Sequence, residues 1–171
     1  MKIHWTTGTY DYLKKLADRH REEKTVLMES AENALLLHET EGKSFFQYPR
    51  SYEVVASFNP FPDEGVVVMH HIYVQEESKP VLEYESQRLA AEMEGAQGLK
   101  AVRFLKPVKN EPYLFLSCWD RESSCERWEQ SKTFSAWREK VKGMEKTGHF
   151  FPKSDYKAVY YIVTEEERAR E

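Results

Sequence analysis

The chain has 171 residues, enough for one domain with a sizeable core or for two small domains. Its hydrophobic content of 40% and aromatic content of 13% are typical of a globular protein rather than a disordered one. The formal net charge is -4 and the charges are interspersed, so no clustered Lys and Arg residues indicate nucleic-acid binding.

No apolar segment reaches the ~18–20 residues that cross a bilayer, and residues 1–7 lack the apolar stretch of a signal peptide. We therefore expect a cytoplasmic protein without membrane insertion. In that compartment Cys118 and Cys125 are expected to be thiols, and their spacing matches no zinc or redox motif. The scattered glycines form no phosphate-binding loop, and no Gly-x-Ser-x-Gly turn is present.

The first third of the chain predicts a small N-terminal α/β domain. Apolar positions spaced for one helix face, together with short β-prone runs, indicate its elements. These are a strand at 2–7, a helix at about 10–20, short strands at 25–28 and 34–38, and a short helix at 51–58. Residues 59–65 contain two prolines and end in glycine, which stops any regular element. We therefore predict two domains, 1–62 and 63–171.

The second domain shows a strand, helix, strand, strand, helix, helix, strand order. The expected elements are a strand at 66–74, a helix at 78–94, a hairpin of 99–105 with 113–119, two short helices and a last strand at 158–163. This order is typical of an α+β ferredoxin-like fold. Its sheet carries helices on one face only. We expect the other, apolar face to pair with a second copy in a dimeric barrel.

Three of the four tryptophans, Trp119, Trp128 and Trp137, recur at a spacing of nine between a strand end and two short helices. Ser131 is a plausible cap for the second short helix, which places Phe134 and Trp137 on one stripe. So much aromatic surface indicates either the lid of a flat apolar pocket or a bulky core.

The second domain resembles the antibiotic biosynthesis monooxygenases, whose ferredoxin-like domains pair into a dimeric α/β barrel. The residues that carry this resemblance are Gly98-Leu99, Phe104-Leu105-Lys106-Pro107, Leu116–Trp119, Trp128-Glu129-Gln130-Ser131 and Phe134. The whole chain is similar to a subgroup with an added N-terminal domain, the HmoB-type heme-degrading monooxygenases and the TRAP proteins. The subgroup features are Thr7-Gly8-Thr9, Glu32-Asn33-Ala34, His38-Glu39-Thr40, Tyr52-Glu53-Val54 and Gly148-His149-Phe150-Phe151.

The resemblance implies a heme-degrading monooxygenase that binds heme between sheet and helices and takes electrons from an external donor. Its heme-degrading members use an Asn on the first domain strand, a Trp on the first short helix and an axial His on the second. The Trp position is Trp128, the Asn position falls on His71 or one place either way, and the axial position is Arg138. Arginine offers no lone pair to iron, so the usual ligand is missing.

Several roles stay open for the candidate site residues. Trp128 and Phe134 either contact heme or form core, and His71 either ligates iron in place of the missing histidine or is a buried structural residue. Arg138 either binds a propionate or is a surface residue, and His149 is the remaining candidate ligand. The alternative function is a TRAP-like regulatory or stress-response protein without chemistry, whose pocket is filled by its own side chains.

Overall fold

The computed structural model describes residues 1–145 and 157–170, so His149 lies outside the described residues. The elements of the N-terminal half are β1 (Lys2–Gly8), α1 (Tyr10–Arg19), β2 (Thr25–Glu29), β3 (Ala34–Thr40) and β4 (Arg50–Phe58). Those of the C-terminal half are β5 (Val66–Ile72), a 3-10 turn (Glu76–Ser78), α2 (Lys79–Glu92), β6 (Leu99–Pro107), β7 (Tyr113–Trp119), α3 (Glu122–Glu129), α4 (Lys132–Lys142), β8 (Lys157–Ile162) and α5 (Glu165–Ala169).

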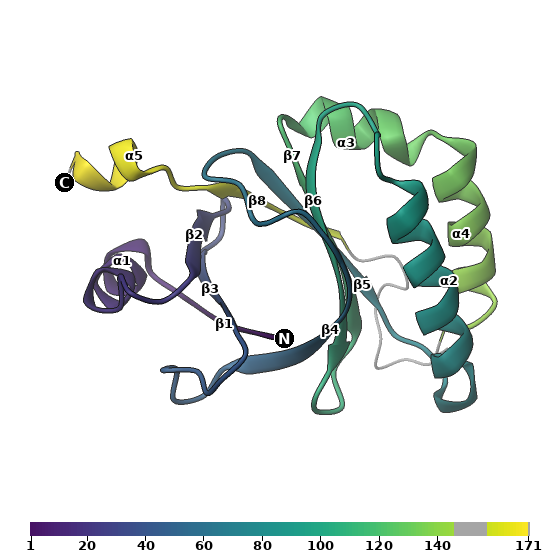
Figure 1. Cartoon of the computed structure of the whole chain (residues 1–171), viewed down its shortest axis with the longest axis horizontal. Helices are drawn as coiled ribbons and strands as arrows, with labels where there is room; N and C mark the ends of the chain where they lie inside the picture. Colours follow the sequence, from purple (N-terminus) through teal and green to yellow (C-terminus); the bar gives the residue numbers. More distant parts are fainter. Residues whose placement is uncertain (146–156, 171) are drawn as a thin grey trace.

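The eight strands form one closed antiparallel barrel in the order β1-β3-β2-β8-β5-β7-β6-β4. Within this order the C-terminal half reads β8-β5-β7-β6, which is the strand order of a ferredoxin-like fold and confirms that prediction. The N-terminal half reads β4-β1-β3-β2, which is the same order. The barrel therefore consists of two similar half-barrels, joined where β2 meets β8 and β4 meets β6 (Figure 1).

The prediction of a helix at 51–58 is wrong, because these residues belong to strand β4. β4 pairs with β1 on one side and β6 on the other, with a register shift between Val54 and Ala56. Such a bulge changes which side chains face inward and so interrupts the alternation that marks a strand in sequence.

The barrel also corrects the expected role of a second copy. Side chains from all eight strands fill the barrel interior: Ile3, Trp5, Val26, Met28, Leu35, Leu37, Tyr52, Val67, Met69, Ala101, Leu105, Leu114, Leu116, Cys118, Tyr160 and Ile162. The sheet face that we expected to bury against a partner is therefore buried against the chain's own N-terminal strands. A homodimer stays a prediction, and it requires another surface.

One end of the barrel is closed by a buried ion pair. Arg103 donates from Nε to Oε2 of Glu39 at 2.7 Å, and its Nη1 donates to the carbonyl oxygens of Phe58 and Asn59 at 3.2 and 2.7 Å. The Phe61 ring covers the guanidinium, and its centroid lies 4.7 Å from Arg103 Cζ. The predicted boundary at 62/63 thus lies beside the loop that closes this end, between two halves that share the barrel.

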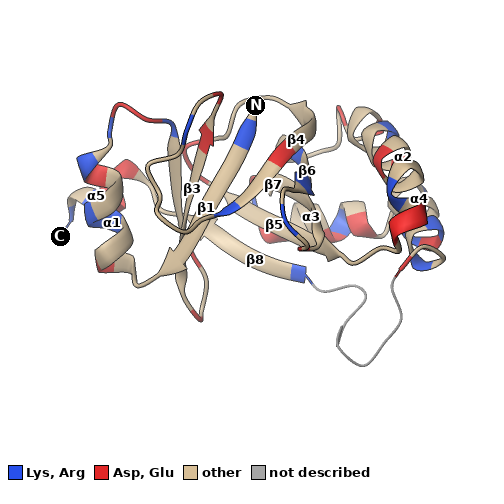
Figure 2. Cartoon of the chain, turned by 90° about the horizontal axis from the view of Figure 1, so that it is seen from below, with Lys and Arg blue, Asp and Glu red and all other residues tan. Residues whose placement is uncertain are grey.

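Helices cover the outside of the barrel on two sides. Helices α2, α3 and α4 lie against the C-terminal half, and α1 lies against the N-terminal half (Figure 1). Charged residues of both signs are distributed over the helices and loops (Figure 2). In the part of the chain that the structure describes, no helix is long and apolar enough to cross a membrane.

Candidate functional site

The turn after β7 sets the direction of helix α3. The Asp120 amide donates to the Gly98 carbonyl oxygen at 2.8 Å, and the Ser124 hydroxyl donates to Asp120 Oδ1 at 2.6 Å. This hydrogen bond holds the pKa of the Asp120 carboxyl below its usual value. Ser131 then caps the start of helix α4, as predicted, and its hydroxyl accepts a hydrogen bond from the Phe134 amide at 3.2 Å.

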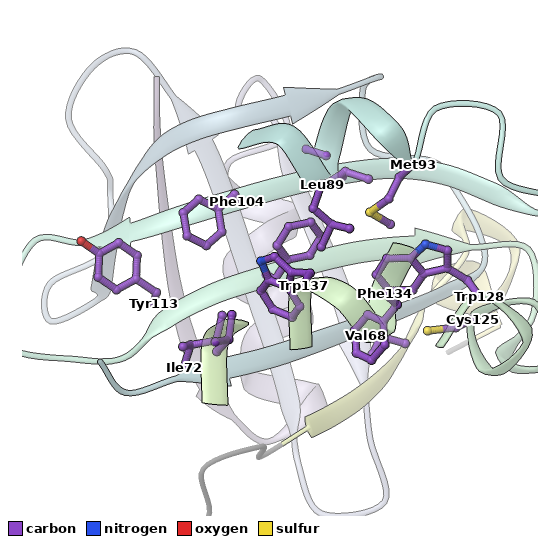
Figure 3. Packing of buried hydrophobic residues seen from close by; sticks show 14 of the residues in the cluster. Val68, Ile72, Leu89, Met93, Phe104, Tyr113, Cys125, Trp128, Phe134 and Trp137 are labelled. Carbon is purple, nitrogen blue, oxygen red and sulfur yellow. The ribbon is translucent and has the colours of Figure 1, made fainter. Parts of the chain in front are cut away.

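The aromatic side chains of these helices fill the space against the sheet. Ring centroids of Trp119 and Trp128 lie 5.7 Å apart, those of Trp128 and Phe134 4.7 Å, those of Phe134 and Trp137 5.7 Å, and those of Phe115 and Trp137 5.4 Å. Figure 3 shows Trp128, Phe134 and Trp137 among the buried side chains of this layer. Trp128 and Phe134 keep 8% and 9% exposure, so they lie at the outer edge of the packed layer.

The two adjacent histidines of β5 face opposite sides of the sheet, as a strand requires. In the register with β7, His70 lies opposite Phe115, which packs under the helices, and His71 lies opposite Leu114, which points into the barrel. His71 therefore faces the barrel interior, and His70 is the histidine that faces the helices. Sequence alone does not distinguish them, because apolar residues flank the pair on both faces.

His70 forms a hydrogen-bonded pair with a carboxylate of helix α3. Its Nε2 lies 2.8 Å from Glu129 Oε2, and Lys157 Nζ lies 3.1 Å from Glu129 Oε1. Burial alone would raise the pKa of the Glu129 carboxyl, but the hydrogen bonds from His70 and Lys157 lower it. Glu129 therefore stays charged and accepts a hydrogen bond from the Nε2–H group of His70. The other ring nitrogen, Nδ1, is buried without a hydrogen-bond partner among the described residues.

Phe134 packs beside His70, with ring centroids 5.5 Å apart, so the structure brings His70, Trp128 and Phe134 together. Arg138, one turn along α4, donates to Glu145 Oε1 at 2.8 Å, with a side chain 17% exposed. It is thus a half-buried ion-pair residue rather than the solvated residue that the surface interpretation assumed. Cys125 also lies in this cluster, but burial raises the pKa of its thiol to about 12, so it offers no thiolate.

A separate cavity of about 440 Å3 opens at the barrel end opposite the Arg103–Glu39 pair. Here β1 and β5 end and β3, β4, β7 and β8 begin. Its walls are Trp5, Thr6, Thr7, Asn33, Leu35, Tyr48, Arg50, Met69, His71, Tyr73, Pro112, Ala158 and Tyr160. His71 therefore belongs to this cavity. No local sequence pattern predicts this cavity, because it forms only when the two halves close into a barrel.

Residues 65–140 match the antibiotic biosynthesis monooxygenase family. This region includes strands β5 to β7, helices α2 and α3 and most of α4. Together with the ferredoxin-like strand order, the match shows that this part of the chain is a domain of that family.

Relatives over most of the chain carry two different descriptions. A heme-degrading monooxygenase of Listeria monocytogenes is 28% identical over 130 residues, which is 76% of this chain and 78% of the relative. The signal transduction protein TRAP of Staphylococcus epidermidis is 25% identical over 135 residues, 79% of this chain and 81% of the relative. A solved structure described as a major regulator of staphylococcal pathogenesis has the same fold, with a TM-score of 0.82, 18% identity and coverage of 95% of this chain and 98% of that one.

Proposed function

We propose that the protein binds heme between the C-terminal sheet and helices α3 and α4 and degrades it oxidatively, with His70 as the iron ligand. The observation that carries this proposal is the Nδ1 of His70, which is buried beside Phe134 and Trp128 and has no hydrogen-bond partner among the described residues. A histidine that ligates a metal commonly donates its other ring N–H to a carboxylate, which fixes the tautomer and raises the basicity of the ligating nitrogen. Glu129 stands in that position at 2.8 Å.

Each residue of this cluster has a distinct task in the proposal. Heme, the substrate, brings the iron and macrocycle at which oxygen and an external reductant react. His70 supplies the lone pair that Arg138 lacks, and Lys157 keeps Glu129 charged. Trp128 presents a rigid indole to one face of the bound ring. Since Trp128 and Phe134 contact each other in this structure, their rings have to separate to admit heme.

The test is a hemin titration followed by absorbance, on the wild type, His70→Ala and the neighbouring control His71→Ala. We expect a saturable Soret band with one heme per chain in the wild type and in His71→Ala, shifted or lost in His70→Ala. Addition of reductant under air should then bleach the band and release iron that a ferrous chelator detects. A Soret band that changes in His71→Ala and persists in His70→Ala would contradict His70 as the ligand.

A second function is favoured by the packing itself. Trp119, Trp128, Phe134 and Trp137 form an uninterrupted chain of ring contacts, and Arg138 is engaged by Glu145. A site filled in this way suits a TRAP-like regulatory or stress-response protein that carries out no chemistry. In that case the wild-type titration is indistinguishable from free hemin in buffer, and the heme proposal fails.

We further propose that the protein acts in the cytoplasm. Cys118 and Cys125 are both unpaired and buried, which suits a reducing compartment that also supplies an electron donor. The proposed homodimer would be joined through surfaces other than the barrel sheet. Light scattering on the purified chain measures its oligomeric state directly.

A further inference from the structure

The cavity at the open end of the barrel lies apart from the proposed heme site. The heme site lies outside the C-terminal sheet, under the helices, whereas this cavity lies inside the barrel. Its volume of about 440 Å3 is within the range of small-molecule sites. The two sites are separated by strand β5, which presents His70 to one and His71 to the other.

The cavity walls combine aromatic rings with one positive charge. Trp5, Tyr48, Tyr73 and Tyr160 supply flat aromatic surface, and Arg50 lies among them. Among the described residues that line the cavity none is acidic, although the whole chain has a net charge of -4. Local charge thus favours an anion, and flat rings favour a planar ligand.

Arg50 keeps hydrogen-bonding capacity for such an anion. Its side chain is 56% exposed, and its salt bridge is with Glu111 at 4.0 Å, a distance longer than a hydrogen bond. A guanidinium presents several donors in a plane, the geometry that matches a carboxylate. The charge therefore lies at the rim of the cavity, where a ligand carboxylate meets it while the ring enters between the aromatic walls.

A buried tyrosine supports the aromatic wall of the cavity from below. Tyr52 is 0% exposed, its ring packs 4.8 Å from that of Trp5, and its hydroxyl has no hydrogen-bond partner in the described residues. Burial raises the pKa of this phenol, and the Arg50 charge opposes that shift. Tyr52 is not among the residues that line the cavity, so it belongs to the packing that supports Trp5 rather than to the ligand contacts.

We propose that this barrel cavity binds a planar aromatic carboxylate of one or two rings, with Arg50 holding the carboxylate and Trp5 and Tyr160 enclosing the ring. The site is distinct from the proposed heme site, so it stands whether or not the chain binds heme. Neither the family match nor the relatives assign it.

The probe is 2-naphthoate, titrated into the isotope-labelled full chain while amide chemical shifts are followed by NMR. We expect saturable shifts at Thr6, Thr7 and His71 and none at the amides of α3 and α4. The uncharged analogue 2-naphthamide should bind about three- to fivefold more weakly, the size of effect expected from one partly exposed charge pair. Absence of saturation, or saturation confined to α3 and α4, would overturn the site.

Variants test the role of Arg50. Arg50→Gln should weaken naphthoate binding about three- to fivefold and leave naphthamide binding unchanged. Arg88→Gln is the matched control, because Arg88 is 52% exposed and lies on helix α2, outside the barrel. Equal affinity of acid and amide for the wild type would overturn the anion class without any variant. Loss of naphthoate affinity in Arg88→Gln equal to that in Arg50→Gln would overturn the assignment to Arg50.

Discussion

Gly98 adopts a φ angle of 85° at the point where α2 gives way to β6, and it lies against the turn that starts α3. A side chain there would place Cβ 2.5 Å from Asp120 Oδ1 and 2.5 Å from Ser124 Oγ. These two atoms form the hydrogen bond that fixes the first turn of α3. One glycine thus controls the direction of the helix that carries Trp128 and Glu129.

We expect Gly98→Ala to lower the free energy of unfolding by about 2–3 kcal/mol, through backbone strain and these close contacts. Gly95→Ala is the matched control, since Gly95 has a φ angle of 92° but no atom within 4 Å of an added Cβ. Gly95→Ala should lower the free energy of unfolding by about 1 kcal/mol. Urea unfolding measures both values. Equal losses in the two variants would show that the contacts with Asp120 and Ser124 contribute nothing.

At the scale of elements, the Arg103–Glu39 pair joins β6 of one half to β3 of the other. Burial alone would raise the pKa of Glu39, but the hydrogen bond and charge of Arg103, with a smaller contribution from Lys24, hold it below its ordinary value of 4.5. The folded protein therefore binds this proton less tightly than the unfolded chain. The stabilisation is present above pH 4.5 and is lost as the pH falls through the lower, folded pKa.

We expect Glu39→Gln to cost about 3 kcal/mol at pH 7, because it leaves the Arg103 charge buried without a carboxylate. Its unfolding free energy should also change less between pH 7 and pH 3 than that of the wild type. Glu53→Gln, on the exposed face of β4, serves as the control. Urea unfolding across this pH range measures the difference. If the unfolding free energy of Glu39→Gln fell with pH in parallel with that of the wild type, another carboxyl group would be responsible for the loss of stability in acid.

Elements with an uninterrupted pattern were predictable from sequence. The β-prone run predicts strand β5, and the Ser131 cap with the stripe of Phe134 and Trp137 predicts helix α4. Strand β4 was not, because its bulge at Val54 and Ala56 breaks the alternation. The identity of the site-facing histidine was also out of reach, since β5 is buried on both faces and a one-residue slip exchanges His70 and His71.

Closure of the barrel could not be predicted, because an apolar sheet face indicates that it will be buried but not which surface will cover it. The ferredoxin-like half alone predicts a second copy, whereas the structure supplies a strand order of the same kind from residues 1–58. The cavity and the buried Arg103–Glu39 pair both arise from this union of the two halves. Features that exist only between halves leave no local pattern in either one.

At the scale of the whole molecule, the two halves are interchangeable in strand order, so each is a potential partner for a copy of itself. A fragment of residues 63–171 would expose Val67, Met69 and Leu116, which the N-terminal half covers in the intact chain. We expect this fragment to associate through that face, and co-expression with residues 1–62 to replace the self-association by a one-to-one complex. Size-exclusion chromatography with light scattering measures both states. A folded monomeric fragment would contradict the argument, because its sheet would then remain stable with one apolar face in water.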